Sequence, residues 1–299
     1  MTTTPAQGRA ADPTPTTANP TPAAAGRTPV IAAAANRSSA VKPGQLCAVV
    51  LAAGAGTRLA PLTDLRPKAL CPVGDKTLLD RALVRLAALG IAGPERVAVN
   101  AHHHADQVAA AVGDRARLSI EQPEALGTAG AVAKLRSWVA GRPVLVCNAD
   151  AYLAGGDLTP LLSDWSGERP RLLVIKDPVR GDFGEWRFAG ISLLPAADAE
   201  RLEPTPTGLY EVVWRAAAAR DELELTPFDG FFVDCGTPSD YLAANLHASG
   251  GASVVGAGAV VEGQLTRSMV WPGGWVGPDE HLVETIRAGR DLTVLAPQP

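Results

Sequence analysis

LCAVVLAAGAGTRLAPLTDLRPKALCPV, residues 46–73, is the stretch that decides how the rest of the chain is interpreted. It opens with a continuous apolar run at 46–53 whose centre is β-branched, which predicts a strand buried on both faces. The run GAGTR follows the strand at once, and the loop that begins there carries two cations, Arg58 and Lys68. Glycines in this place let backbone N–H groups approach phosphate oxygens closely, and two nearby cations suit a triphosphate. The stretch therefore predicts a strand that leads into a phosphate-binding loop.

The residues after this loop alternate between helical and strand patterns. TLLDRALVRLAALG (77–90) has the spacing of an amphipathic helix, with Thr77 as its N-cap, Asp80 at the capping-box position and Gly90 at its end. Further strands are predicted at 96–100, 117–122, 143–150 and 171–177, and further helices at 105–112 and 128–141. Strands separated by helices imply right-handed βαβ crossovers. The expected fold class is therefore α/β with a mostly parallel sheet.

Composition narrows the functional classes. The chain has 299 residues with 27 Lys+Arg against 31 Asp+Glu, a formal net charge of −4, so no basic surface for nucleic acid or for an anionic membrane is expected. Its apolar stretches are far shorter than the roughly 20 residues that cross a bilayer. Four scattered cysteines do not suit a disulfide-stapled secreted fold. We expect a cytoplasmic protein that binds neither nucleic acid nor membrane.

The two ends of the chain differ from the middle, which we expect to be one domain at 45–248. Residues 1–44 are rich in Pro, Thr and Ala and lack aromatic residues, so they cannot offset their ordering entropy and predict a disordered tail. In residues 249–299, Gly and small aliphatic residues recur about every five to six positions, which favours a short left-handed parallel β-helix of one or two coils. The alternative is an irregular Gly-rich tail. Trp271 and Trp275 lie there, and each either packs onto the main domain or serves an oligomer contact.

The loop at 54–68 has the spacing G-x-G-T-R-L-x-P-L-T-x-x-x-P-K. This spacing closely resembles the signature of the sugar-1-phosphate nucleotidylyltransferases. Three further segments resemble the same family in the same order: Glu121 with LGTAG (126–130), NAD (148–150) and FFVDCGTP (231–238). The resemblance covers about residues 46–295 and implies a Rossmann-like three-layer nucleotidyltransferase domain. The run GTAG (127–130) is most similar to the mannose-1-phosphate guanylyltransferases and their relatives.

The resemblance implies a reaction that joins a nucleoside triphosphate to a sugar 1-phosphate and releases pyrophosphate. It implies catalytic roles for Arg58 and Lys68, and it implies that Asp150 and Asp234 bind a Mg²⁺ ion. It assigns the nucleotide to Leu51, Ala53, Gly54, Gly56, Thr57, Glu121, Gly127 and Thr128, and the sugar to Asn148, Gly190 and Lys176. The attacking phosphate needs no general base because its second pKa is about 6. Positioning and electrostatic stabilisation should therefore dominate the catalysis.

One region departs from the family pattern, between Lys176 and Leu202. The family usually has a longer hairpin there, which builds one wall of the sugar site. Here only residues 185–187 separate Gly184 from the run at 188–191, which resembles the sugar-contacting turn. We expect GTP and a hexose 1-phosphate such as mannose 1-phosphate. The alternatives are UTP, dTTP or CTP with another sugar, a catalytically silent nucleotide-sugar-binding regulatory subunit, and a molybdenum-cofactor nucleotidylyltransferase. A homo-oligomer is left open.

Overall fold

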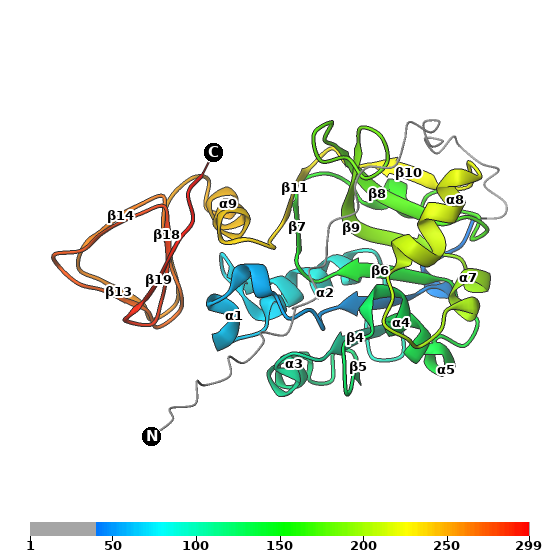
Figure 1. Cartoon of the computed structure of the whole chain (residues 1–299), viewed down its shortest axis with the longest axis horizontal. Helices are drawn as coiled ribbons and strands as arrows, with labels where there is room; N and C mark the ends of the chain where they lie inside the picture. The colour runs from blue at the N-terminus through cyan, green and yellow to red at the C-terminus, as the bar shows by residue number, and fades with distance from the viewer. Residues whose placement is uncertain (1–39, 299) are drawn as a thin grey trace, which may run out of the picture.

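The structure, a computed structural model, describes residues 40–298 (Figure 1). Of the tail predicted at 1–44, residues 1–39 lie outside the described residues. The backbone N–H of Val41 donates a hydrogen bond to the carbonyl oxygen of Trp165 at 2.8 Å. The folded domain therefore reaches a few residues further toward the N-terminus than the predicted boundary.

A seven-stranded sheet forms the centre of the domain (Figure 1). Its strands are β1 (Cys47–Leu51), β4 (Val97–Ala101), β5 (Arg117–Ile120), β6 (Val144–Asn148), β8 (Arg171–Lys176), β9 (Trp186–Leu194) and β10 (Glu224–Pro227). Their spatial order is β10-β8-β9-β6-β1-β4-β5. All neighbours pair in parallel except β9, which runs antiparallel to both β6 and β8. The predicted α/β class with a mostly parallel sheet is confirmed.

Helices cover both faces of the sheet and make three layers. One face packs against α2 (Leu78–Ala88), α3 (Ala105–Val112) and α6 (Thr159–Leu162). The other packs against α4 (Gly127–Lys134), α5 (Arg136–Val139), α7 (Ala196–Arg201) and α8 (Arg215–Ala219), which a π-helical turn at Tyr210–Trp214 precedes. The N-cap predicted for α2 is present, since the Thr77 hydroxyl accepts from the Asp80 N–H at 3.0 Å. The helix predicted at 128–141 is instead split into α4 and α5, because Leu135 leaves the α-helical conformation (φ −90°, ψ 7°).

A two-stranded antiparallel ribbon stands above the carboxyl end of β6. It pairs β7 (Ala151–Ala154) with β11 (Phe231–Asp234). The segment after β11 begins α9 (Pro238–Ala248), whose N-cap is Thr237. The remaining short elements are α1 (Leu62–Leu65), β2 (Pro72–Val73) and β3 (Lys76–Thr77). The ribbon matters for function because it brings the predicted metal ligand on β11 back to the end of β6.

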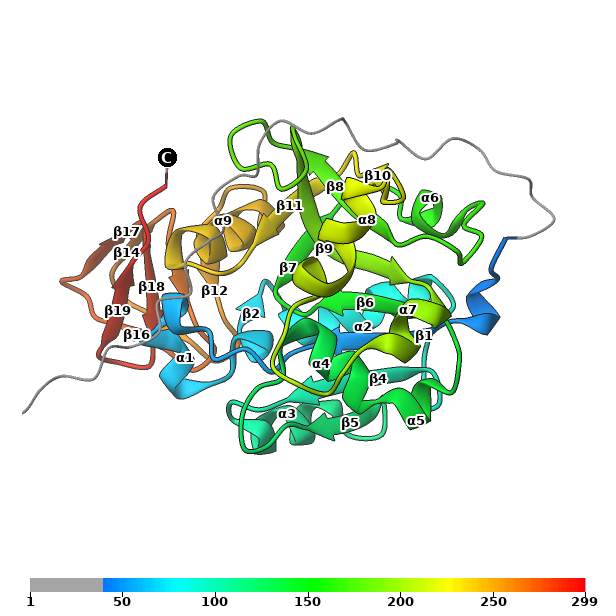
Figure 2. The ribbon, with the colours of Figure 1, turned by 45° about the vertical axis from the view of Figure 1, so that its right-hand side comes forward.

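The C-terminal segment forms stacked coils of short strands, not an irregular tail. The first coil holds β12 (Val254–Val255), β13 (Val260–Val261) and β14 (Gln264–Thr266), and the second holds β15 (Met269–Val270), β16 (Trp275–Val276) and β17 (His281–Val283). Each strand of the first coil pairs in parallel with its counterpart in the second, and β18 (Thr285–Ala288) pairs in parallel with β15. The final strand, β19 (Leu292–Leu295), turns back antiparallel on β18. The coils enclose a triangular outline in Figure 1 and lie beside α9 and α1 in Figure 2.

None of the helices between residues 40 and 298 has the length and apolar character that a bilayer crossing requires.

Candidate active site

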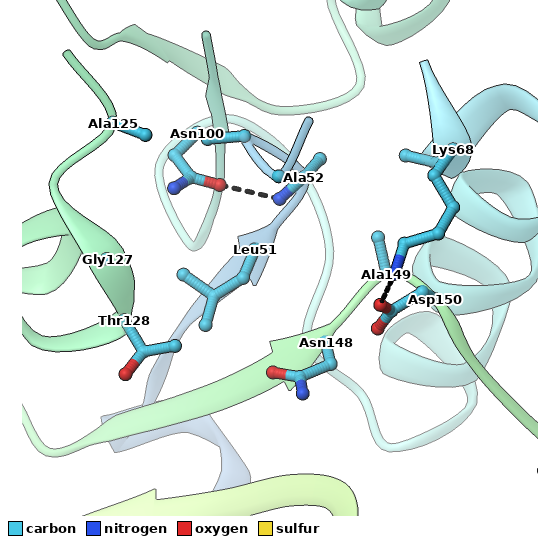
Figure 3. Close-up of a pocket in the computed structure, with 13 residues that line it drawn as sticks. Leu51, Ala52, Lys68, Asn100, Ala125, Gly127, Thr128, Asn148, Ala149 and Asp150 are labelled. Atoms are coloured by element: carbon cyan, nitrogen blue, oxygen red, sulfur yellow. Dashed lines mark hydrogen bonds and ion pairs between the residues drawn. The ribbon is translucent and has the colours of Figure 1, made fainter. Parts of the chain in front are cut away.

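A pocket of about 220 Å³ opens at the carboxyl ends of β1, β4 and β6 (Figure 3). This is the edge at which open α/β sheets bind ligands. Of the residues predicted to bind the nucleotide, those that line it are Leu51, Ala53, Gly54, Gly127 and Thr128. The predicted sugar ligand Asn148, the predicted metal ligand Asp150 and the predicted catalytic Lys68 line it as well.

Four predicted charged residues meet at the mouth of this pocket. On the side of the pocket opposite Gly127 and Thr128, the Lys68 side chain forms an ion pair with Asp150 (Figure 3). The ribbon register places Asp234 opposite Ala151, directly after Asp150 in the chain. Nη2 of Arg58 lies 3.8 Å from Oδ2 of Asp234. Two cations and two carboxylates from four separate segments therefore lie close together.

Burial shapes the electrostatics of this cluster. It raises the pKa of Asp234, the neighbouring Asp150 carboxylate raises that pKa further, and Lys68 and Arg58 offset only part of the effect. For Lys68, burial acts to lower the pKa, but Asp150 and Asp234 together outweigh it and raise the pKa above its ordinary value. Lys68 therefore keeps its charge.

The two aspartates fit a hard divalent cation. Oδ1 of Asp234 is buried and has no hydrogen-bond partner among the described residues. A buried carboxylate oxygen without a partner is costly unless something positive meets it. Within residues 40–298, no group of three or more His, Cys, Asp or Glu side chains converges as a complete ligand set. Because Mg²⁺ commonly takes one or two carboxylates and completes its shell with phosphate oxygens and water, a pair of aspartates is sufficient here.

Gly56 and Thr57 shape the loop and do not line the pocket. Gly56 has a φ of +65°, and a Cβ on it would lie 2.8 Å from Cγ2 of Thr63. The Thr63 hydroxyl also donates a hydrogen bond to the Gly56 carbonyl oxygen at 3.1 Å. Thr57 begins the 3-10 turn that follows. Glycine is therefore needed at position 56 so that the loop can fold back on itself.

Glu121 lies behind the pocket, where it supports the residues that line it. Its side chain is fully buried, and Oε2 accepts a hydrogen bond from the Leu126 N–H at 2.7 Å. Oε1 accepts from Nδ2 of Asn100 at 2.8 Å, and Oδ1 of Asn100 accepts from the Ala52 N–H at 2.6 Å. Asn100, which lines the pocket (Figure 3), was missed by the sequence analysis. Its position at the carboxyl end of a predicted parallel strand is the signal that could have found it.

The glycines of the run at 127–130 have a packing role. A segment from the far half of the domain crosses the start of α4. A Cβ on Gly127 would lie 2.5 Å from the Thr207 carbonyl oxygen, and one on Gly130 would lie 2.4 Å from that of Thr205. The run that resembles a nucleobase-binding turn therefore also admits the crossing segment.

A second pocket of about 310 Å³ adjoins the first. The two share Leu51, Thr128 and Asn148 as lining residues. The second pocket is otherwise lined by Val146, Phe188, Ser192, Gly208, Leu209, Tyr210, Glu211 and Trp214. The rings of Phe188 and Trp214 lie 4.8 Å apart, centre to centre.

The resemblance suggested a turn at 188–191, but in the structure this run lies within β9. Gly190 has a φ of +80°, and a Cβ on it would lie 2.4 Å from Cβ of Ala151. Gly190 lines neither pocket. Its role in the structure is to let β9 approach the start of β7 closely.

Lys176 does not reach either pocket. It lies at the end of β8 opposite Trp186, its side chain is 62% exposed, and Nζ pairs with Oε2 of Glu185 at 3.2 Å. An exposed lysine paired with a surface carboxylate is placed poorly for a substrate phosphate.

Arg187 lies near enough to Asp234 to affect its pKa, and it forms an ion pair with Asp177, whose Oδ2 lies 3.6 Å from Nη1 of Arg187. It pairs with Ile175 in the ladder, so it points to the opposite face from Lys176. Its guanidinium lies 5.4 Å from the ring centre of Phe232, which shares a face of β11 with Asp234. Burial raises the pKa of Asp234, and Arg187 is among the charges that offset this. In the sequence, Arg187 stands out only as one of the residues between Gly184 and Phe188, because strand register is needed to tell its position from that of Lys176.

This chain is similar to known nucleotidyltransferases. The nucleotidyl transferase family matches residues 47–179. The N-acetylmuramate alpha-1-phosphate uridylyltransferase of Caulobacter vibrioides is 38% identical over 231 residues, which cover 66% of this chain and 94% of that protein. The mannose-1-phosphate guanylyltransferase catalytic subunit beta of Drosophila pseudoobscura pseudoobscura is 28% identical over 227 residues, covering 65% of this chain and 60% of the relative.

A solved structure shows the same fold. It is that of mannose-1-phosphate geranyltransferase from Thermus thermophilus, with a TM-score of 0.61 at 20% identity. The match covers 84% of this chain and 94% of the other.

Proposed function

This chain belongs to the nucleotidyl transferase family, and from that membership we propose that it transfers a nucleotidyl group from a nucleoside triphosphate to a sugar 1-phosphate. Its relatives are sugar-1-phosphate nucleotidyltransferases, and it is an enzyme of that type. The observation that carries the proposal is the cluster of Lys68, Asp150 and Asp234 at the mouth of the glycine-loop pocket. Two anionic substrates repel each other. Lys68, together with a divalent cation held by the two aspartates, would supply the positive charge that opposes this repulsion.

In the proposed reaction, an oxygen of the sugar 1-phosphate attacks the α-phosphorus of the triphosphate. A phosphorus–oxygen bond forms there while the bond from the α-phosphorus to the oxygen bridging to the β-phosphate breaks, and pyrophosphate leaves. No side chain has to remove a proton, because the second pKa of the attacking phosphate is about 6. Rate enhancement then comes from alignment and charge stabilisation.

Different residues of the loop bind different phosphates of the triphosphate. Arg58 and the backbone N–H groups of residues 54–57 hold the β- and γ-phosphates. Lys68 neutralises charge at the α-phosphate, and the raised pKa of Lys68 supports this role because the ammonium stays charged although it is buried. A compact ammonium acts as a point charge that can follow the phosphorus as its geometry changes.

Asp150 and Asp234 are the residues that hold Mg²⁺ in this proposal. When bound, the ion neutralises charge on the phosphate oxygens of the reacting groups. The unpartnered Oδ1 of Asp234 and the adjacent second carboxylate support the assignment.

The second pocket is the proposed site of the sugar. Asn148 lines both pockets and so lies where the two substrates would meet. Phe188 and Trp214 supply an aromatic wall for the apolar face of a sugar ring. In the proposal, Arg187 takes the place of Lys176 as the cation for the phosphate group, on the side of Asp234 and not within the sugar pocket. Binding the phosphate would require Arg187 to exchange its ion pair with Asp177. Gly190 contributes by bringing β9 close to the site.

Two substrate pairs are proposed. The run GTAG at 127–130 supports GTP with mannose 1-phosphate, in line with the Drosophila relative. The greater identity to the Caulobacter relative, over nearly all of its length, supports UTP with N-acetylmuramate 1-phosphate and gives that pair the stronger claim.

One assay tests these proposals. The full chain and Mg²⁺ are incubated with GTP, UTP, dTTP or CTP against mannose, glucose, N-acetylglucosamine and N-acetylmuramate 1-phosphates, and pyrophosphate is measured, with EDTA as control. We expect release with one preferred pair. Binding of a nucleotide sugar by calorimetry without release from any pair would support a silent regulatory subunit.

We also propose that the C-terminal coils wind in the left-handed sense and that the protein forms a homo-oligomer. A crystal structure would test the first proposal, and light scattering after size exclusion would test the second.

A further inference from the structure

The two tryptophans of the C-terminal coils have different surroundings. Trp271 is 2% exposed and belongs to a buried cluster that also holds side chains of the main domain. Trp275 is partly exposed, and the guanidinium of Arg290 lies 4.6 Å from its ring centre. Of the two roles expected for these residues, packing onto the domain therefore applies to Trp271.

Trp271 contacts the phosphate-binding loop directly. The Arg66 guanidinium lies 4.5 Å from the centre of the Trp271 ring, where the face of the ring attracts the cation. Leu59 and Leu62, which belong to the same loop, are fully buried in the same cluster. The coils therefore hold the middle of the loop through apolar packing and through the cation–π contact between Arg66 and Trp271.

A second connection passes through Tyr241 on α9. Nε1 of Trp271 donates a hydrogen bond to the Tyr241 hydroxyl oxygen at 3.1 Å, and that hydroxyl donates to the carbonyl oxygen of Pro72. Nδ2 of Asn245 donates to the same carbonyl oxygen at 3.3 Å. The side chains of Tyr241 and Asn245 are fully buried, so water cannot replace these bonds without cost.

Arg66 and Pro72 lie on either side of Lys68 in the chain. Between them the backbone makes one 3-10 turn, Lys68–Leu70, closed by a bond from the Cys71 N–H to the Lys68 carbonyl oxygen at 2.9 Å. Local bonds of this kind fix the shape of a turn but not its place in the domain. The anchors on both sides therefore help to set where Lys68 lies relative to Asp150.

We propose that Trp271 is a positioning residue for the transfer reaction: through it, the C-terminal coils hold the loop so that Lys68 reaches the transferred phosphate. The inference rests on the proposed role of Lys68. Misplacing a group at a reacting centre by about 1 Å can cost about 10²-fold in rate. The coils thus serve the chemistry without lining the pocket.

A double-mutant cycle in the full chain tests this. Trp271→Leu removes both connections, and we expect kcat to fall about 10- to 100-fold while KM for the triphosphate changes little. In a Lys68→Ala background, the same substitution should change kcat by less than about 3-fold, because nothing remains to be positioned. Trp275→Leu is the matched control and should keep the kcat of the unmodified chain.

Trp271→Phe keeps a ring beneath Arg66 and loses only the donor to Tyr241, so an intermediate loss is expected. This variant decides the question if Trp271→Leu does not fold, since its loss should also disappear in the Lys68→Ala background. Losses that multiply in the double variant, or an equal loss from Trp275→Leu, would overturn the positioning role and leave that of Lys68 intact. Full turnover of Lys68→Ala alone would overturn the role of Lys68 and this inference with it.

Discussion

The two pockets of the active site share Leu51, Thr128 and Asn148, yet their remaining walls come from very different parts of the sequence. The first pocket, which we call the nucleotide pocket after its proposed ligand, is walled by the ends of parallel strands and the loops that follow them. The second pocket takes its wall from β9, which is antiparallel, and from the segment Leu209–Trp214, which crosses over from the far half of the domain. In the proposed reaction, the triphosphate thus binds where strands and the loops that follow them supply the lining. The sugar 1-phosphate binds where segments far apart in the sequence come together.

The largest expected effect comes from removing the carboxylates at the mouth of the nucleotide pocket. Asp150→Asn and Asp234→Asn should each lower turnover about 10³-fold or more, because both hold the proposed ion. The double variant should be little worse than either single one, since parts of one unit are non-additive. Melting temperatures should stay near that of the unmodified chain, and pyrophosphate release measures the loss. Activity that persists in EDTA, or single losses that multiply, would contradict a shared ion.

The cations of the loop come next. Arg58→Ala and Lys68→Ala should each reduce turnover about 10²- to 10³-fold, as is typical when one preorganised charge is lost. Lys68→Arg should not restore it, because a planar guanidinium does not replace a compact ammonium. The losses should be equal for every accepted sugar 1-phosphate, since both residues serve the nucleotide side. Near-normal activity of either alanine variant would show that the loop does not hold the triphosphate.

Substitutions of Arg187 and Lys176 test the proposed binding of the sugar 1-phosphate. Arg187→Ala should raise KM for the sugar 1-phosphate about 10- to 100-fold, the range expected for lost charge-assisted hydrogen bonds, and leave KM for the triphosphate nearly unchanged. Lys176→Ala is the matched control and should stay within about 2-fold, as for an exposed ion pair. Initial-rate kinetics with each substrate varied in turn measure both. A larger effect from Lys176→Ala would reverse the assignment.

The smallest effects are expected at the N-terminus. A chain that starts at Ala40 should keep the melting temperature and turnover of the full chain. A chain that starts at Leu46 also loses the Val41–Trp165 hydrogen bond, and it should melt about 2–4 °C lower with unchanged turnover. Thermal denaturation and the pyrophosphate assay compare the two. A loss of turnover in the first chain would show that the removed residues contribute to the site.

The same division between local and long-range structure decides what the sequence could predict. The helix expected at 105–112 has those bounds in the structure, and the Thr77–Asp80 capping box is present, because periodicity and caps are local signals. The pairing of β7 with β11 could not be predicted, since their residues are some 80 positions apart. Gly190 was predicted in a turn although it lies in a strand, because a glycine required by the approach of another backbone has the same sequence pattern as a turn glycine.

The hydrogen bond from the Leu209 N–H to the Thr128 hydroxyl oxygen, 2.7 Å long, joins the two pockets mechanically. The crossing segment at 205–207 leaves no room for a Cβ on Gly127. The start of α4 and this segment are therefore packed too closely to move independently. A nucleotide that shifts the start of α4 must therefore shift an anchor of the sugar wall. We expect the two binding free energies to be coupled, and such coupling is reciprocal: the nucleotide changes the affinity for the sugar phosphate by the same factor as the sugar phosphate changes the affinity for the nucleotide. The size of this coupling then depends on a hydrogen bond that lies outside the cluster of Lys68, Asp150 and Asp234.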